Sequence, residues 1–254
     1  MVKKRGGSAG RIRVGVGGWT YEPWRGTFYP DGLAQSKELH FASRALTSIE
    51  INGTYYSTFK PASWEKWHDE TPDDFVFSVK ASRYCTNRKV LAEAGPSVEK
   101  FLAQGLTSLG SKLGPINWQF MATKRYDEQD FAAFLALLPK ERHGVALRHA
   151  VEVRHDSFAA PGFYRLARDH GVAIVVADDE DFPHIDERTA DLTYARLMTT
   201  SEAEAAGVSA TEVRTLAKRV CDWAKAGDVF AFFISGAKDR NPLAAQALIG
   251  ALDR

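Results

Sequence analysis

Charged side chains recur near the C-terminal ends of strand-like segments in this sequence of 254 residues. The carboxylates are Glu50, Glu152 and Asp178, and the cations are Lys80, Arg154 and Arg196. Carboxylates can act as general bases or accept hydrogen bonds from sugar hydroxyls, and guanidinium groups bind phosphate or carboxylate through paired hydrogen bonds. Together these residues predict a site for a polar or anionic ligand.

Eight strand-like runs would position these side chains, and most of them are separated by segments with helical periodicity. The runs span residues 13–19, 48–52, 75–80, 115–120, 150–156, 173–178, 192–197 and 228–235. The connection at 179–191 is short and only weakly helical. This pattern predicts an α/β fold, a (β/α)8 TIM-type barrel that is irregular around the sixth helix. A doubly wound sheet is the competing arrangement, but Gly15-x-Gly17-Gly18 lacks the third glycine at the head of a helix.

The alternation of side chains along each strand predicts which residues face the interior of the barrel. Residues that face outward must pack on helices, so the outward positions should be apolar. By this rule the outward pairs are Ile49/Ile51, Val151/Val153 and Val175/Ala177. Asn52 and Gln119 then join the charged residues on the inner side, late in their strands. That end of a barrel is where TIM-type enzymes carry their active sites.

Two interpretations of this charged ring stay open. The three carboxylates and three cations either neutralise one another as a structural network, or line a pocket that orients a ligand and shifts pKa values. In the second interpretation Glu152 or Glu50 is the general base, and Lys80 and Asp178 are further catalytic candidates. Such acid–base chemistry is typical of hydrolases, isomerases and lyases. In the first interpretation the ring is purely structural and the barrel has no catalytic activity.

The ligand of such a pocket is expected to be sugar-like or phosphorylated. Arg154, Arg196 and Lys80 would hold its anionic group, because guanidinium and ammonium groups donate charge-assisted hydrogen bonds. Asn52 and Gln119 would bind its polar atoms through their side-chain amides.

Aromatic and loop residues complete the predicted ligand-binding set. Trp19 and Tyr21 follow the first strand and are candidates to stack on a sugar ring or a base. His155 follows the fifth strand. The segment 235–240 follows the eighth strand and leads into a helix, and loops at this position often hold phosphate in barrels.

A divalent metal ion is the alternative cofactor. Glu50, Glu152, Asp178 and His155 would supply oxygen and imidazole ligands for Mg²⁺, Mn²⁺ or Zn²⁺. No HxH or HExxH spacing supports this, and neighbouring cations such as Arg154 would oppose a metal ion. No metal ligand is therefore assigned.

The composition bounds the class of protein. The chain is 44% hydrophobic and 26% charged with a net charge of +1, which indicates a soluble globular protein without a global attraction to nucleic acid or membranes. Cys85 and Cys221 lie far apart, which fits a reducing compartment, and no apolar run is long enough to span a bilayer. We expect a cytoplasmic protein with a flexible basic tail at 1–11 and a single barrel domain at 12–254. Its oligomeric state is not predicted.

Two aromatic-rich motifs resemble the YecE-like proteins, a family built on a domain of unknown function. The first motif covers residues 15–21 and 24–30, and the second covers 50–56, followed by Trp64. The resemblance implies a TIM-type barrel and no established reaction, and it suggests nucleic acid as an alternative partner through a nuclease-like activity. This chain departs from the family pattern at Cys85-Thr86-Asn87, where relatives tend to have Thr-His, and at Ile234-Ser235, where they have Asn-Asn. These departures imply a changed specificity or a lost activity.

Overall fold

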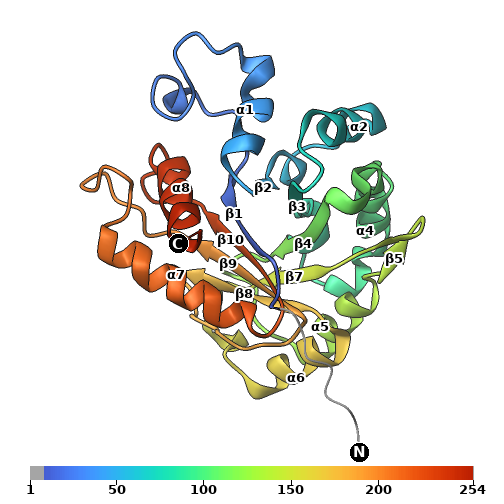
Figure 1. Ribbon diagram of the computed structural model, residues 1–254. Coiled ribbons are helices and arrows are strands. Elements are labelled where there is room, and N and C mark those ends of the chain that lie inside the picture. Colours follow the sequence, from blue (N-terminus) through green and yellow to red (C-terminus); the bar gives the residue numbers. More distant parts are fainter. Residues whose placement is uncertain (1–8, 254) are drawn as a thin grey trace, which may run out of the picture.

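A closed barrel of eight parallel strands forms the centre of the structure, a computed structural model that describes residues 9–253 (Figure 1). The strands are β1 (Ile12–Gly17), β2 (Ser48–Ile51), β3 (Val76–Lys80), β4 (Leu113–Gln119), β7 (His149–Glu152), β8 (Ala173–Asp178), β9 (Leu192–Leu197) and β10 (Asp228–Phe233). Their order around the barrel is β1-β10-β9-β8-β7-β4-β3-β2, and every neighbouring pair is parallel. The predicted TIM-type barrel is confirmed, and each predicted strand-like run overlaps one of these strands.

Helices surround the barrel and cover its outer face (Figure 1). They are α1 (Glu38–Ala45), α2 (Pro61–Glu70), α3 (Arg83–Thr86), α4 (Gly95–Leu102), α5 (Glu128–Ala136), α6 (Pro161–His170), α7 (Ala210–Ala224) and α8 (Asn241–Leu252). Local signals fix several ends. Ser209 and Glu212 form a reciprocal capping box at the start of α7, and Gly171 ends α6 in the left-handed conformation. Of the helices in residues 9–253, none is long and apolar enough to cross a membrane.

Two hydrophobic clusters separate the inside of the barrel from the layer beneath the helices. Ile49, Ile51, Val151 and Val153 belong to the outer cluster, as the alternation predicts. The inner cluster contains Ala150, Ala173, Val175, Leu192, Tyr194, Phe230, Phe232 and Ile234. The outward assignment of Val175 and Ala177 is therefore wrong, because Ile174 and Val176 are the residues of β8 that pack under the helices.

Glycine lets β1 lie close to its neighbours at the polar end of the barrel. A Cβ atom at Gly15 would overlap the carbonyl oxygen of Ser48, and one at Gly17 would meet the side chains of Asn52 and Ile234. These glycines therefore serve strand packing and leave space beside Asn52, in agreement with the absence of a complete dinucleotide-binding motif.

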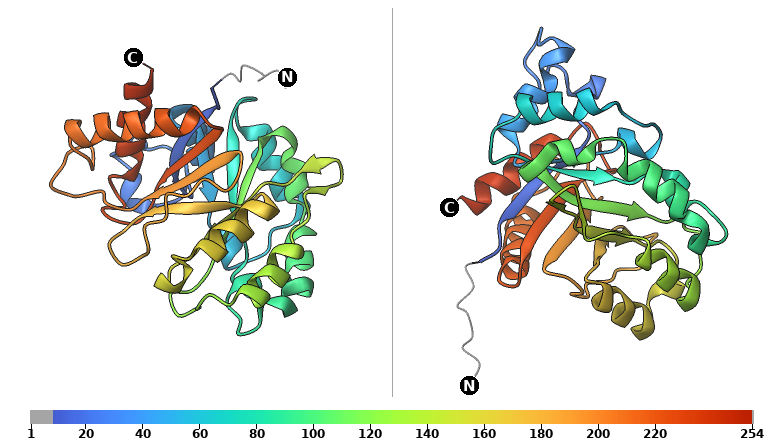
Figure 2. Two further views of the ribbon diagram at one scale, coloured as in Figure 1. Left: turned by 90° about the horizontal axis from the view of Figure 1, so that it is seen from below. Right: turned by 90° about the vertical axis from the view of Figure 1, so that its right-hand side faces the viewer.

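Residues 95–112 do not form the single helix that their apolar periodicity predicts. The apolar spacing predicts one helix face through Val98, Leu102 and Leu109, but α4 ends at Leu102 and a 3-10 segment follows from Leu106 to Lys112. Gly105 stands between them with a φ of 105°, close to Pro61 and Trp64 of α2. A short hairpin, β5 (Glu141–Arg142) and β6 (Val145–Ala146), also projects from the barrel without a sequence prediction (Figure 2).

The connection after β8 contains no helix, which confirms the predicted irregularity. Residues 179–191 are held against α7 instead, where Trp223 donates to Asp186 Oδ1 at 3.1 Å. At the other end of the chain, residues 1–8 of the predicted tail lie outside the described residues. Gly10 and Arg11 are not free, because their amides donate to Ala224 O at 2.7 Å and Asp228 Oδ1 at 2.9 Å.

Candidate functional site

Two fully buried carboxylates and one arginine lie inside the barrel near the C-terminal ends of the strands. Arg196 Nη1 donates to Glu152 Oε2 at 2.6 Å, and Arg196 Nη2 donates to Glu50 Oε1 at 3.2 Å. Both carboxylates are 0% exposed and Arg196 is 2% exposed. The three side chains come from β2, β7 and β9, so the arginine links strands that are not neighbours in the barrel.

Asn117 and Tyr194 complete the hydrogen bonding of these carboxylates. Asn117 Nδ2 donates to Glu50 Oε2 at 3.2 Å and to Glu152 Oε2 at 3.1 Å, and the Tyr194 hydroxyl donates to Glu50 Oε2 in a short hydrogen bond. Neither residue was predicted from the sequence. The alternation of side chains along a strand could have identified both as inward residues, because Asn117 is two residues before Gln119 and Tyr194 is two residues before Arg196. We call Glu50, Glu152, Arg196, Asn117 and Tyr194 the buried layer.

Arg154 and Gln119 lie above the buried layer. Arg154 Nε and Nη2 donate to Glu152 Oε1 at 2.9 and 2.6 Å, and Arg154 Nη2 also donates to Gln119 Oε1 at 3.0 Å. The Arg154 side chain is 23% exposed, and its guanidinium carbon is 4.4 Å from the centre of the Phe182 ring. Phe182 comes from the irregular loop after β8, so that loop covers one face of the arginine.

Lys80 is the cation of this cluster without a carboxylate partner. Its ammonium group is 4.7 Å from the centre of the Tyr55 ring, and among residues 9–253 it forms no salt bridge. Burial lowers the pKa of Lys80 to about 8, and repulsion from Arg196 adds to this, while Glu50 and Glu152 raise it less. The amine is thus partly deprotonated near neutral pH. We call Lys80, Arg154 and Asn52 the mouth layer.

In the buried layer, by contrast, Glu152 stays charged and Tyr194 stays protonated. Burial would raise the pKa of Glu152, but the charges of Arg196, Arg154 and Lys80 outweigh this and lower it to about 2. The pKa of Tyr194 is raised well above its ordinary value by burial and by Glu50. Because all four carboxylate oxygens of Glu50 and Glu152 accept hydrogen bonds, Glu152 is a weak base in this arrangement.

Asn52 lies at the end of β2, beside Gly17 and Ile234. Its Oδ1 atom is buried and accepts no hydrogen bond from the residues that the structure describes. A buried acceptor without a partner is uncommon in folded proteins. This oxygen therefore has unused hydrogen-bonding capacity at the end of β2.

Asp178 does not belong to the cluster. It follows Ala177, and Ala177 is the residue of β8 that pairs with Arg196 and is 1% exposed. Asp178 and the inner residue Val175 lie on opposite faces of β8, so Asp178 shares the face of Ile174 and Val176. Its side chain is half-buried. The predicted inward position of Asp178 is wrong. The residues of β8 before Asp178 are all apolar, so no polar residue indicates which face of the strand points inward.

The aromatic and histidine candidates have mostly local roles. Trp19 packs edge-on against Trp67 of α2 at 5.2 Å and Phe77 at 6.2 Å, outside the barrel rather than over its mouth. His155 Nδ1 accepts from the Ser157 amide at 3.0 Å and caps a short 3-10 turn. Tyr21 contacts the loop after β10, because the Lys238 ammonium lies 4.0 Å from its ring centre.

A metal centre is not supported by the donor set. Within residues 9–253, no three His, Cys, Asp or Glu side chains converge. Arg196 occupies the space between Glu50 and Glu152, where a cation would need to bind. His155 and Asp178, the other two ligands considered, do not join these carboxylates.

Comparison with known proteins agrees with this architecture. Residues 13–254 match the family described as "Protein of unknown function DUF72". UPF0759 protein YecE of Escherichia coli strain K12 is 28% identical over 154 residues, which cover 59% of this chain and 51% of that protein. UPF0759 protein YunF of Bacillus subtilis strain 168 is 26% identical over 159 residues, covering 60% and 54%.

The chain spans about half the length of these curated relatives. A solved structure of a DUF72 family protein from Thermotoga maritima superimposes with a TM-score of 0.75 at 23% identity, covering 96% of this chain and 100% of that one. This likeness supports the fold. Because the family match extends over residues 13–254, the chain belongs to the DUF72 family.

Proposed function

We propose that the mouth layer binds a small anionic, hydroxyl-bearing molecule such as a sugar phosphate or a sugar acid. The observation that carries this proposal is the state of Lys80. It is a partly buried cation beside a carboxylate pair whose oxygens are all occupied by other donors. A bound anion would supply the partner that Lys80 lacks.

The charge balance supports an anion rather than a cation. Glu50 and Glu152 are matched by Arg154 and Arg196, so these four residues are neutral together. Lys80 then adds one positive charge to the cluster when it is protonated. The partnerless Oδ1 of Asn52 would accept a hydrogen bond from a ligand hydroxyl.

The same lysine also supports general-base chemistry of the isomerase or lyase kind. With a pKa of about 8, a minor fraction of Lys80 is neutral near physiological pH and can accept a proton from a bound substrate. Glu152, with a pKa of about 2 and both oxygens hydrogen-bonded, is better suited to hold Arg154 and Arg196 in position. Lys80 therefore replaces Glu152 as the preferred base.

The test is a calorimetric titration of the full chain with a panel of sugar phosphates and sugar acids. Lys80→Met should weaken binding by about tenfold or more, since one charge-assisted contact is lost. Lys66→Met, at an exposed position on α2, is the matched control and should bind as the unmodified chain does.

The pH dependence separates binding from catalysis. An anion binds the protonated lysine, so its affinity should be full below pH 8 and decline as the pH rises through the pKa of Lys80. A general base works in its neutral form, so turnover should rise over the same range. Equal affinity in Lys80→Met and Lys66→Met, or no saturable binding by any member of the panel, would count against the proposal.

A further inference from the structure

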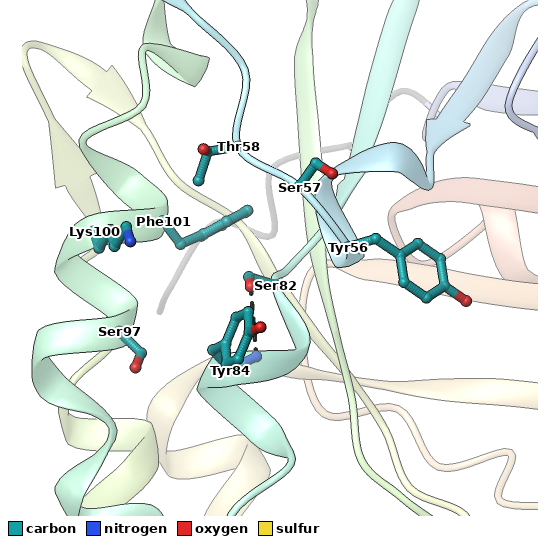
Figure 3. A pocket seen from close by; sticks show the side chains of 8 residues that line it. All are labelled: Tyr56, Ser57, Thr58, Ser82, Tyr84, Ser97, Lys100 and Phe101. Carbon is teal, nitrogen blue, oxygen red and sulfur yellow. Dashed lines mark hydrogen bonds between the residues drawn. The ribbon is translucent and has the colours of Figure 1, made fainter.

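A cavity lies outside the charged cluster, between the segment after β2, the start of α3 and helix α4 (Figure 3). Its volume is about 630 Å³, within the range of small-molecule sites in proteins. None of the side chains that line it belongs to the buried layer or the mouth layer. It can therefore be considered as a site of its own.

Hydroxyl groups line this cavity from three separate segments. Ser57 and Thr58 follow β2, Ser82 precedes α3, and Ser97 lies on α4. Figure 3 shows Ser97 on α4 and Ser82 on a separate segment, with Ser57 and Thr58 on the segment after β2. Hydroxyls both donate and accept hydrogen bonds, so this lining suits phosphate oxygens and sugar hydroxyls.

The charge around the cavity is positive. Lys100 of α4 lines it, and no carboxylate is among its lining residues. Arg88 lies next to the wall, because its Nη2 atom donates to Ser97 Oγ at 3.5 Å. A ligand with an anionic group is favoured by this combination of hydroxyls and cations.

Aromatic side chains supply an apolar surface in the same cavity. Phe101 is 1% exposed and reaches toward the centre of the cavity from α4. Tyr84 is 63% exposed, which is unusual for so large a side chain, and its ring lies 5.5 Å from the Arg83 guanidinium. An exposed tyrosine ring held in this way offers a face on which a sugar ring can stack.

We propose that this cavity is a second binding site, specific for a phosphorylated sugar, with the phosphate on Lys100 and Ser97 and the sugar ring on Tyr84. The site does not depend on the function proposed for the mouth layer. Lys100 lines this cavity and Lys80 does not, so substitution of one leaves the other site intact.

The experiment follows backbone amide chemical shifts of the full chain during titration with glucose 6-phosphate, inorganic phosphate and glucose. Glucose 6-phosphate should shift the amides of Ser82, Ser97 and Lys100 in a saturable way. Lys100→Met should weaken this response by about tenfold, and Tyr84→Ala should weaken it while leaving inorganic phosphate unaffected. Lys80→Met should leave the response at these three amides unchanged.

Two results would overturn the proposal. One is the absence of saturable shifts at these amides with glucose 6-phosphate. The other is a response that persists unchanged in both Lys100→Met and Tyr84→Ala. If the shifts appear only around Lys80, the mouth layer binds the sugar phosphate and this second site does not exist.

Discussion

The buried layer and the mouth layer are adjacent in the barrel, yet their hydrogen bonding is different. In the buried layer both oxygens of Glu50 and Glu152 accept from Arg196, Asn117 or another donor, and these carboxylates are 0% exposed. In the mouth layer Lys80 has no carboxylate partner within the described chain, and Asn52 Oδ1 has no donor. Among the described residues, Asn117 Oδ1 and Arg196 Nε of the buried layer also lack partners, so the contrast lies in the charged groups: both carboxylates are fully paired, whereas Lys80 is not. Paired charges support the fold, whereas an unpaired cation is available to a ligand.

Removal of Arg196 should have the largest effect on stability. Arg196→Met leaves Glu50 and Glu152 buried without their shared cation, and breaking a buried ion pair from one side costs about 3–5 kcal/mol of unfolding free energy. Urea denaturation measures this loss. If Arg196→Met lowers the unfolding free energy by no more than a surface substitution does, the buried layer does not stabilise the fold.

The matched control is the exposed pair Arg165–Glu128, whose side chains are 65% and 58% exposed. Arg165→Met should cost about 0.5 kcal/mol or less, because exposed ion pairs are weak. Adding Glu50→Gln and Glu152→Gln to Arg196→Met should restore part of the stability, since the uncompensated charges are then removed. This rescue separates an electrostatic cause from a simple loss of packing.

Removal of Lys80 should have a smaller effect, and its sign should depend on pH. The pKa of Lys80 is about 8 in the folded chain and about 10.5 when exposed, so between these values the unfolded chain holds more protons. Stability from this group therefore rises as the pH increases from 8 to 10.5, by at most about 3 kcal/mol. Below pH 8 the buried charge is a cost, so Lys80→Met should be neutral or stabilising at pH 7.

The measurement is the difference in unfolding free energy between the unmodified chain and Lys80→Met from pH 7 to 10. Tyrosines with raised pKa values, such as Tyr194, oppose the rise at high pH, but they are common to both proteins and cancel in the difference. Lys66→Met should show no such dependence. A difference that stays flat over this range would mean that Lys80 keeps an ordinary pKa.

The sequence was sufficient to place most of the charged cluster. In β2 and β7 the apolar residues on one face leave no ambiguity, so Glu50 and Glu152 were assigned inward correctly by alternation alone. The pairing of individual atoms was not accessible in this way. That Arg196 bridges both carboxylates depends on the order and register of strands that are not neighbours in the barrel.

The sequence was not sufficient where a side chain follows a strand or where both faces are apolar. Trp19 is two residues beyond β1, and the turn there directs it toward Trp67 rather than over the barrel. Asn117 stands in a largely apolar run, which gives no sign of a polar site, although alternation with Gln119 places it inside. In β8 every residue before Asp178 is apolar, so neither face could be identified from the sequence.

The smallest effect is expected at Asp178, and it tests the orientation of β8. Because Asp178 lies outside the charged cluster and is half-buried, Asp178→Ala should change the unfolding free energy by about 0.5 kcal/mol or less and leave anion binding unchanged. Ala177→Asp is the converse change at an inner position that is 1% exposed, and it should destabilise the chain by burying a further carboxylate. If Asp178→Ala lowered the unfolding free energy more than Ala177→Asp does, Asp178 would lie inside the barrel and the cluster would contain a third carboxylate. In that case the charge balance that favours an anionic ligand would no longer hold.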